Sequence, residues 1–217
     1  YDVVVANPPY MGGKGMCGEL KTFAKNEYPD SKSDLFAMFI ERGFDLAMES
    51  IGYNALVTMH SWMFLSSFEK FRKQMLQEKS IVSMAHLGPG GFDHASAMIV
   101  QTTAFVLKNS PPIHSYRPVF LRLLDGNEAV KKLMLLKGEN RYDNFAQDYF
   151  EDLPDSPIAY WVGNTTRKVF LESAPLEETA DIRAGLQTGD TARFLRLWFE
   201  VSHSKIGLGL DRDSARR

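Results

Sequence analysis

A short β-branched run that ends in prolines constrains the fold of this chain more than any other feature. Val3-Val4-Val5-Ala6 is apolar without alternation, which is typical of a parallel strand buried on both faces. The run stops at Asn7-Pro8-Pro9, because proline cannot donate a hydrogen bond to a β-ladder. The chain therefore opens on a predicted central strand of a layered sheet.

Strand-like and helix-like patterns alternate after this run. Further strands are expected at 54–59, 81–87 and 99–107, with a helical pattern before each of the first two. The last two strands have no helix between them and are expected to be antiparallel. The order β-α-β-α-β-β predicts a layered α/β sheet with right-handed crossovers.

Local sequence patterns predict where two helices begin and where one long loop lies. Ser33 predicts an N-cap with Asp34 in the first turn, and Ser66 with Glu69 forms a capping-box pattern. Residues 11–32 are rich in glycine, lysine and polar residues, which predicts a long functional or disordered loop.

Two proline residues mark a break in the pattern. Asn109-Ser110-Pro111-Pro112 separates a predicted region 1–110 from a predicted region 111–217. The second region is expected to hold a strand at 119–124 and a helix at 127–137.

Composition bounds the class of protein. The 217 residues carry a net charge of −2, which gives no support for a DNA-binding face, so a nucleic-acid role must rest on a motif. The single cysteine, Cys17, favours a reducing compartment, and we expect a cytoplasmic protein. No stretch is apolar enough to cross a membrane, and the five histidines show no metal-binding spacing.

The residues after the first run suit one kind of chemistry. Ligands of open α/β sheets bind at the carboxyl ends of strands, which is where Asn7 to Tyr10 lie. The exocyclic amine of adenine is a poor nucleophile, because its lone pair is delocalised into the ring. The Asn7 side-chain oxygen and the Pro8 carbonyl can accept its two N–H groups, Pro9 stiffens the loop, and Tyr10 offers a flat face for stacking the base.

A strand followed by Asn7-Pro8-Pro9-Tyr10 resembles the signature of class I amino-methyltransferases, chiefly the γ-type N6-adenine DNA methyltransferases. The segments 33–39, 54–62 and 87–107 follow the order of that family's later motifs. The resemblance covers about the first half of the chain. It implies the C-terminal half of a Rossmann-like class I sheet with an antiparallel edge pair, then a partial α+β target-recognition region.

The same resemblance implies the ligands and the site residues. The expected cofactor is S-adenosyl-L-methionine, and the expected substrate is an adenine flipped out of double-stranded DNA. Asn7, Pro8, Pro9 and Tyr10 would be catalytic, Tyr10 and Phe92 would sandwich the base, and Asn7 and Phe39 would lie on the cofactor side. Packing within a turn is the alternative role for Phe92, and packing in a helix core is the alternative for Phe39.

The second half resembles the start of the target-recognition region in large phage-defence (BREX-type) adenine methyltransferases and in fused restriction–modification enzymes. The segments that carry this likeness are 156–161, 185–190 and 193–198. The likeness implies base reading by this region and other defence or restriction subunits as partners.

Two alternative functions remain open, as does the question of how much of the active site the chain carries. The same tetrapeptide serves methyltransferases that act on RNA or on a protein glutamine, and a non-catalytic DNA-binding subunit is a further reading. In the family, a glycine-rich cofactor loop and an acidic ribose-binding residue precede the position of Asn7. We therefore expect this chain to carry the acceptor side of the site only, and to be inactive alone.

Overall fold

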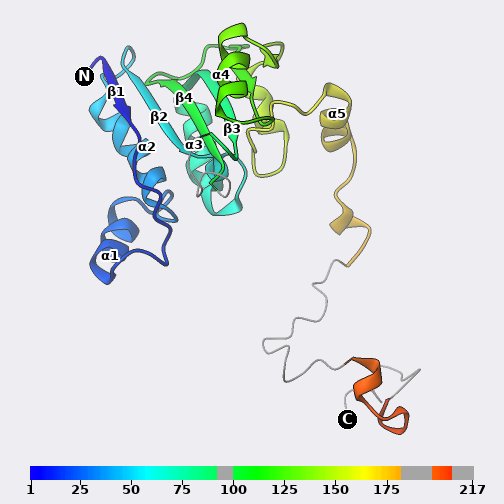
Figure 1. The fold of residues 1–217 in the computed structure, drawn as a ribbon. Helices are drawn as coiled ribbons and strands as arrows, with labels where there is room; N and C mark the ends of the chain where they lie inside the picture. Colours follow the sequence, from blue (N-terminus) through cyan, green and yellow to red (C-terminus); the bar gives the residue numbers. More distant parts are fainter. Residues whose placement is uncertain (92–99, 182–196, 207–217) are drawn as a thin grey trace. The chain divides into compact units, whose positions relative to one another are not determined.

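The computed structural model describes residues 1–91, 100–181 and 197–206. It divides the chain into two compact units, residues 1–173 and 174–217. The first unit contains a six-stranded sheet (Figure 1). Its strands are β1 (Val3–Ala6), β2 (Tyr53–Met59), β3 (Ser80–Gly88), β4 (Thr102–Lys108), β5 (Val119–Arg122) and β6 (Arg141–Tyr142).

Helices connect and cover these strands. The α-helices are α1 (Gly18–Glu27), α2 (Leu35–Leu46), α3 (Glu69–Glu78), α4 (Glu128–Lys137) and α5 (Asn164–Glu172). Short 3-10 helices of the first unit are η1 (His60–Met63), η2 (Ser66–Phe68) and η4 (Gln147–Asp152), and those of the second are η5 (Leu176–Glu178), η6 (Trp198–Glu200) and η7 (His203–Lys205). Among the described residues, none of the helices has the length and apolar character that a membrane span needs.

The strand order determines which strand ends meet. The order is β1-β2-β4-β3-β5-β6, and β1 pairs parallel with β2, as β3 does with β5. Because β4 is antiparallel to both β2 and β3, the strands β1, β2, β3 and β5 all run in one direction. Their carboxyl ends therefore lie along one edge of the sheet. The predicted α/β fold and the antiparallel pairing of β3 with β4 are confirmed.

One face of the sheet packs against α2 and α3. Along β2 burial alternates, with Asn54, Leu56 and Thr58 buried, and the core joins these strands to both helices. Helix α2 approaches β2 closely at Gly43, where an added Cβ would lie 2.4 Å from the Asn54 side chain. The buried Asn54 amide uses this approach to donate to the Ile40 carbonyl at 2.9 Å.

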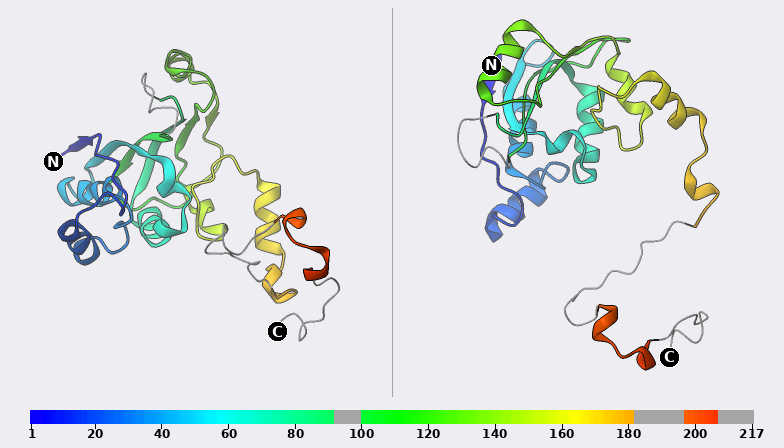
Figure 2. Two further views of the ribbon diagram at one scale, coloured as in Figure 1. Left: turned by 60° about the horizontal axis from the view of Figure 1, so that its bottom comes forward. Right: turned by 45° about the vertical axis from the view of Figure 1, so that its right-hand side comes forward.

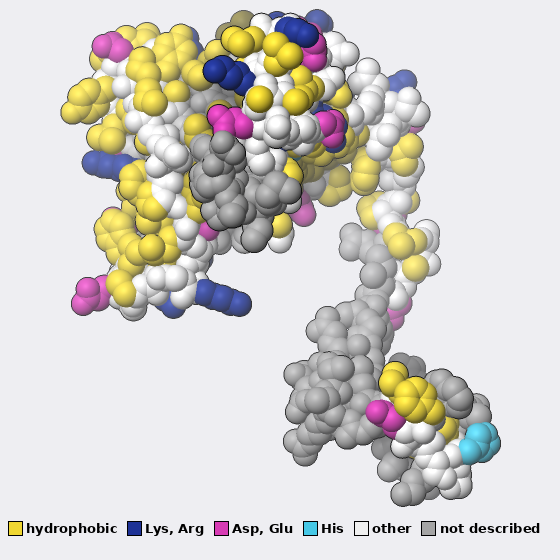
Figure 3. All heavy atoms as spheres, in the orientation of Figure 1, with side chains coloured by type: hydrophobic (Ala, Val, Ile, Leu, Met, Phe, Trp, Pro, Cys, Tyr) yellow, Lys and Arg dark blue, Asp and Glu magenta, His cyan; other side chains and the backbone are white. Residues whose placement is uncertain are grey.

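The other face of the sheet is largely uncovered in the described residues. Val3 and Val5 are 53% and 75% exposed, and β1 pairs on one side only. The prediction that Val3–Ala6 is buried on both faces is therefore wrong for this structure, because nothing in the described residues covers the face that carries Val3 and Val5. Different views of the sheet are shown in Figure 2, and hydrophobic side chains are plentiful on the part of the surface around β1 (Figure 3).

Two buried polar side chains attach the segment after residue 111 to the first strands and helices. The Arg72 guanidinium is fully buried and donates to four carbonyls, two of which belong to Asp155 and Ser156. The Gln147 amide donates to the Leu76 carbonyl at 2.9 Å and accepts from the Ile81 amide at 2.8 Å. The first compact unit extends to residue 173 and so includes the predicted boundary at residue 110, and the division into regions 1–110 and 111–217 stays a prediction.

Three local expectations are corrected. Residues 11–32 contain α1 instead of forming one long loop, and Ala24 of this helix packs in a small cluster with Met16 and Met38. The N-cap of α2 is Asp34 and not Ser33, because the Asp34 carboxylate accepts from the Phe36 amide. Helix α3 begins at Glu69 after a 3-10 turn, with no side-chain cap hydrogen bond.

Candidate active site

The predicted catalytic loop lies at the carboxyl end of β1. Tyr10 is half-buried, and its hydroxyl lies 3.4 Å from the Asn7 Oδ1 and 3.5 Å from the Val57 carbonyl. Its ring meets the core ring of Phe36 edge to face, with centroids 6.1 Å apart. Burial raises the pKa of the Tyr10 phenol, so the hydroxyl stays protonated. The loop is thus held against β2 and the first turn of α2.

Asp34 anchors the end of this loop. Its carboxylate accepts from the Met11 amide at 2.9 Å, while the Leu35 amide donates to the Met11 carbonyl at 3.0 Å. Burial raises the pKa of Asp34, and the backbone hydrogen bonds from Met11 and Phe36 oppose that shift. The residue that caps α2 therefore also fixes the position of the loop after Tyr10.

The two predicted acceptor groups keep hydrogen-bonding capacity within the described residues. Asn7 is exposed, and its only side-chain hydrogen bond among the described residues is the long one from Tyr10. Pro8 is buried, yet within the described part of the chain no hydrogen bond reaches its carbonyl. An amide oxygen has two lone pairs, so the Tyr10 contact leaves acceptor capacity on Asn7.

Of the two aromatic residues predicted to complete the site, the structure describes Phe39 but not Phe92. Phe39 is 41% exposed on α2 and lies outside the buried core, so the alternative role as a core residue is not what the structure shows. Phe92 falls outside the described residues. Its predicted stacking role stays a prediction.

A histidine pair on the same edge of the sheet was not recognised from the sequence as part of the site. His60 follows β2, and its Nδ1 lies 2.7 Å from the Nε2 of His86 on β3. The other ring nitrogen of His86 lies 3.1 Å from the Tyr160 hydroxyl. Burial, with the positive charges of His60, Arg122 and Lys131, lowers the pKa of His86 to about 4. The only signal in the sequence was the position of His60 at a strand end.

A lysine of α4 holds the turn after β3 by hydrogen bonds to its backbone carbonyls. Lys131 of α4 is buried, and its ammonium donates to the carbonyls of Leu87, Pro89 and Leu124. Gly88 has a φ of +62°, and an added Cβ would lie 2.7 Å from the Leu124 side chain, so this position requires glycine. The turn that leads toward Phe92 is therefore rigid at its start.

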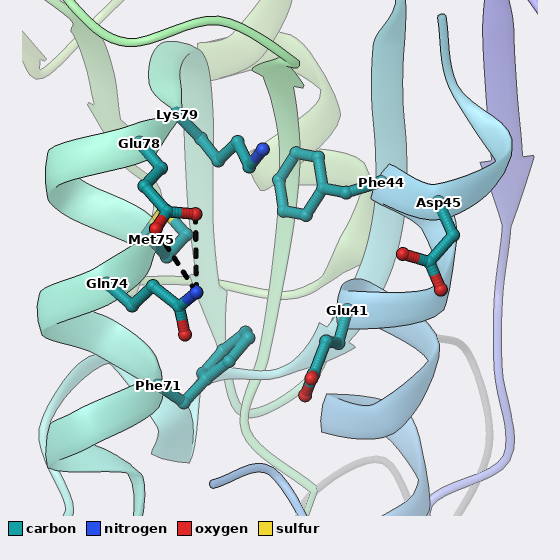
Figure 4. A pocket seen from close by; sticks show the side chains of 8 residues that line it. All are labelled: Glu41, Phe44, Asp45, Phe71, Gln74, Met75, Glu78 and Lys79. Carbon is teal, nitrogen blue, oxygen red and sulfur yellow. Dashed lines mark hydrogen bonds between the residues drawn. The ribbon is translucent and has the colours of Figure 1, made fainter. Parts of the chain in front are cut away.

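A groove between α2 and α3 is a different feature (Figure 4). Side chains of both helices and of Lys79 line it, with Phe44 facing the Lys79 ammonium at 5.0 Å. The groove lies beside the C-terminal halves of both helices, which lead into the amino ends of β2 and β3. It is thus at the opposite edge of the sheet from Asn7.

Comparison with known proteins finds similarity to methylases and adenine-specific methyltransferases. Residues 1–92 match the family of Eco57I restriction-modification methylases. The chain is 52% identical over 205 residues to the adenine-specific methyltransferase BrxX of Escherichia coli O9:H4 (strain HS), with 93% of this chain and 16% of BrxX covered. It is 39% identical over 213 residues to the adenine-specific methyltransferase PglX of Lacticaseibacillus casei (strain Zhang), with 95% of this chain and 18% of PglX covered.

Among solved structures, the modification subunit of a putative type I restriction enzyme from Vibrio vulnificus YJ016 aligns with a TM-score of 0.47 at 18% identity, over 68% of this chain and 34% of that chain. The chain spans less than a fifth of the length of the two curated relatives. By sequence it is a relative of the adenine-specific methyltransferases BrxX and PglX, and the part that matches the Eco57I restriction-modification methylase family, residues 1–92, is the part that carries Asn7–Tyr10.

Proposed function

We propose that the protein to which this chain belongs methylates the N6 amino group of an adenine flipped out of double-stranded DNA. The observation that carries the proposal is a pair of acceptors at the carboxyl end of β1, the exposed Asn7 amide oxygen and the Pro8 carbonyl, which the hydrogen bonds of the described residues leave unsaturated. The names of BrxX and PglX support adenine as the target.

The two acceptors act by position and by charge. Each takes one N–H of the exocyclic amine, which holds the nitrogen and favours a lone pair localised on it. Tyr10 supplies one wall for the base, and its contact with Phe36 fixes the ring before the substrate binds. Phe92 is proposed as the second wall.

The proposed methyl donor is S-adenosyl-L-methionine, which supplies an electrophilic methyl group. Asn7 and Phe39 are both exposed, as residues that contact a bound cofactor must be. We assign these two residues of the chain to the cofactor side. We further propose DNA and other restriction or defence subunits as partners, in line with the named relatives.

Methyl transfer to competing substrates tests the proposal. The complete polypeptide that contains these residues is incubated with labelled S-adenosyl-L-methionine and with duplex DNA, structured RNA or a glutamine-containing peptide. Label is expected in the duplex only, and Asn7→Ala is expected to lower the rate by about 100-fold or more while DNA binding is kept. Transfer to RNA or peptide in place of DNA would contradict the proposal. Binding of DNA without any transfer would support a non-catalytic role.

A further inference from the structure

A half-exposed tryptophan stands on the same edge of the sheet as the catalytic loop. Trp161 is 40% exposed, and its ring lies 5.5 Å from the ring of Phe64 and 6.0 Å from that of His86, measured between centroids. No hydrogen bond within the described residues uses its indole N–H. A flat aromatic surface with a free donor is therefore presented to solvent.

The backbone just before Trp161 is fixed. Tyr160 is buried and stacks on Phe120 with centroids 4.5 Å apart, and the Ile158 amide donates to the Met63 carbonyl at 2.9 Å. A ligand that stacks on Trp161 would therefore meet a ring that is already in place, which lowers the entropy cost of binding.

A cation accompanies this ring. The Arg122 guanidinium, at the carboxyl end of β5, lies 6.0 Å from the Trp161 ring centroid. Its Nε is buried without a hydrogen-bond partner, and none of the ion pairs of the described residues includes Arg122. The charged side chains that act on neighbouring His86 include Arg122 and Lys131, both positive. Lys131 has Asp125 nearby and donates to three carbonyls, so Arg122 is the cation that remains for an anion.

A second arginine–aromatic pair in the same unit differs from the Arg122–Trp161 pair because its arginine has an ion-pair partner. Arg167 lies 3.7 Å from the ring of Tyr149, which is 39% exposed, and its Nε is also unpartnered. However, its Nη2 forms an ion pair with Asp152. The charge of Arg167 is thus neutralised within the protein, whereas that of Arg122 is not.

We propose that Trp161 and Arg122 form a subsite for one nucleotide of the DNA other than the target adenine, with the base stacked on Trp161 and the phosphate bound by Arg122. Stacking on an aromatic ring combined with a cation at the phosphate is the usual means of holding an unpaired nucleotide. The inference rests on the proposed function for the identity of the ligand as DNA.

The sheet places this subsite at a defined separation from Asn7. Four strand spacings of about 4.8 Å separate β1 from β5 in the order β1-β2-β4-β3-β5, which gives about 19 Å. Arg122, which ends β5, is therefore well separated from the end of β1, and Tyr10 already forms the proposed wall for the target base, so we assign the nucleotide on Trp161 to another position.

Binding of labelled duplex DNA to the complete polypeptide, measured by fluorescence anisotropy over a series of salt concentrations, tests the subsite. Trp161→Leu is expected to weaken binding roughly 5- to 150-fold. Arg122→Gln is expected to reduce the slope of log affinity against log salt by about 0.9, the loss of one phosphate contact. The matched controls are Tyr149→Leu and Arg167→Gln. Both should leave the affinity within twofold of the unmodified protein and the slope of log affinity against log salt unchanged.

Tryptophan fluorescence gives a second readout that does not depend on a destabilising variant. DNA should quench the unmodified protein, whereas Trp161→Phe, which keeps an aromatic face, should bind DNA and lose most of the quenching. Unchanged affinity and slope in Trp161→Leu and Arg122→Gln, or full quenching in Trp161→Phe, would overturn the subsite even if the protein methylates DNA. Subsite-dependent DNA binding without any methyl transfer would overturn the proposed function alone.

Discussion

At the scale of single residues, the His60–His86 pair makes a prediction about pH. The folded pKa of His86 is about 4, below the ordinary value of 6.5, because burial and nearby positive charges disfavour the protonated ring. Between these values the unfolded chain binds a proton that the folded chain does not. Stability is therefore complete above about pH 6.5 and falls as the pH is lowered toward 4, by up to about 3 kcal/mol.

Chemical denaturation at a series of pH values measures this effect. His86→Gln should flatten the dependence between pH 6.5 and 4. The control His114→Gln, whose side chain is 94% exposed, should retain the full dependence. An unchanged slope in His86→Gln would show that other groups cause the loss.

Tyr10 makes a second prediction at this scale. Its hydroxyl contacts are 3.4 and 3.5 Å long and hence weak, whereas its ring packs against Phe36. Tyr10→Phe should therefore retain methyl transfer within a few-fold. Tyr10→Ala should weaken the flipped-base state by roughly 1–3 kcal/mol, measured with 2-aminopurine at the target position. Equal losses in the two variants would show that the hydroxyl, and not the ring, is the important group.

At the scale of elements, α3 depends on Arg72 for its attachment to the segment after residue 111. Arg72→Met would leave the carbonyls of Trp62, Leu65, Asp155 and Ser156 without their donor in a buried place. The expected loss is about 3–5 kcal/mol in the free energy of unfolding.

The control for this loss is Arg42→Met on α2. Arg42 and its partner Asp45 are 55% and 57% exposed in their side chains, so their removal should change stability by less than about 0.5 kcal/mol. Because Arg72 lies within one compact unit, its variant should lower a single cooperative transition. Two separate transitions for residues 1–110 and 111–173 would contradict the observed packing.

The elements also show what the sequence could predict. Strands such as Val3–Ala6 and the helix after Asn127 have strong local signals, and the structure confirms both. Helix α1 was missed because its stability depends on packing of Met16 and Ala24 against Met38, which is distant in the sequence. The position of Asp34 as the cap was missed for the same reason, since Asp34 also binds Met11.

At the scale of the whole molecule, the uncovered face and edge of β1 predict self-association of the 217-residue chain. Val5 is 75% exposed, and the outer backbone edge of β1 has no strand partner in the described part of the chain. Val5→Lys should reduce association in sedimentation velocity, because a charge on an edge strand opposes pairing. Val130→Lys on α4, a site 45% exposed, is the control and should leave association unchanged.

The site shows the same division between what the sequence could and could not predict. Asn7–Tyr10 could be proposed as a site from the sequence, because four consecutive residues with suitable chemistry directly follow a strand. The neighbours His60, His86 and Trp161 come from three separate segments, and only the sheet brings them to one edge. No local pattern could have identified that group.

The most direct measurement is the identity of the methylated nucleoside. Duplex DNA is incubated with the complete polypeptide and S-adenosyl-L-methionine, digested to nucleosides and analysed by mass spectrometry, in parallel with Asn7→Ala. N6-methyladenine is predicted with the unmodified protein and is predicted to fall by about 100-fold or more with Asn7→Ala. Methylation of another base, or an equal yield of N6-methyladenine from Asn7→Ala, would contradict the assignment of Asn7–Tyr10 as the acceptor site.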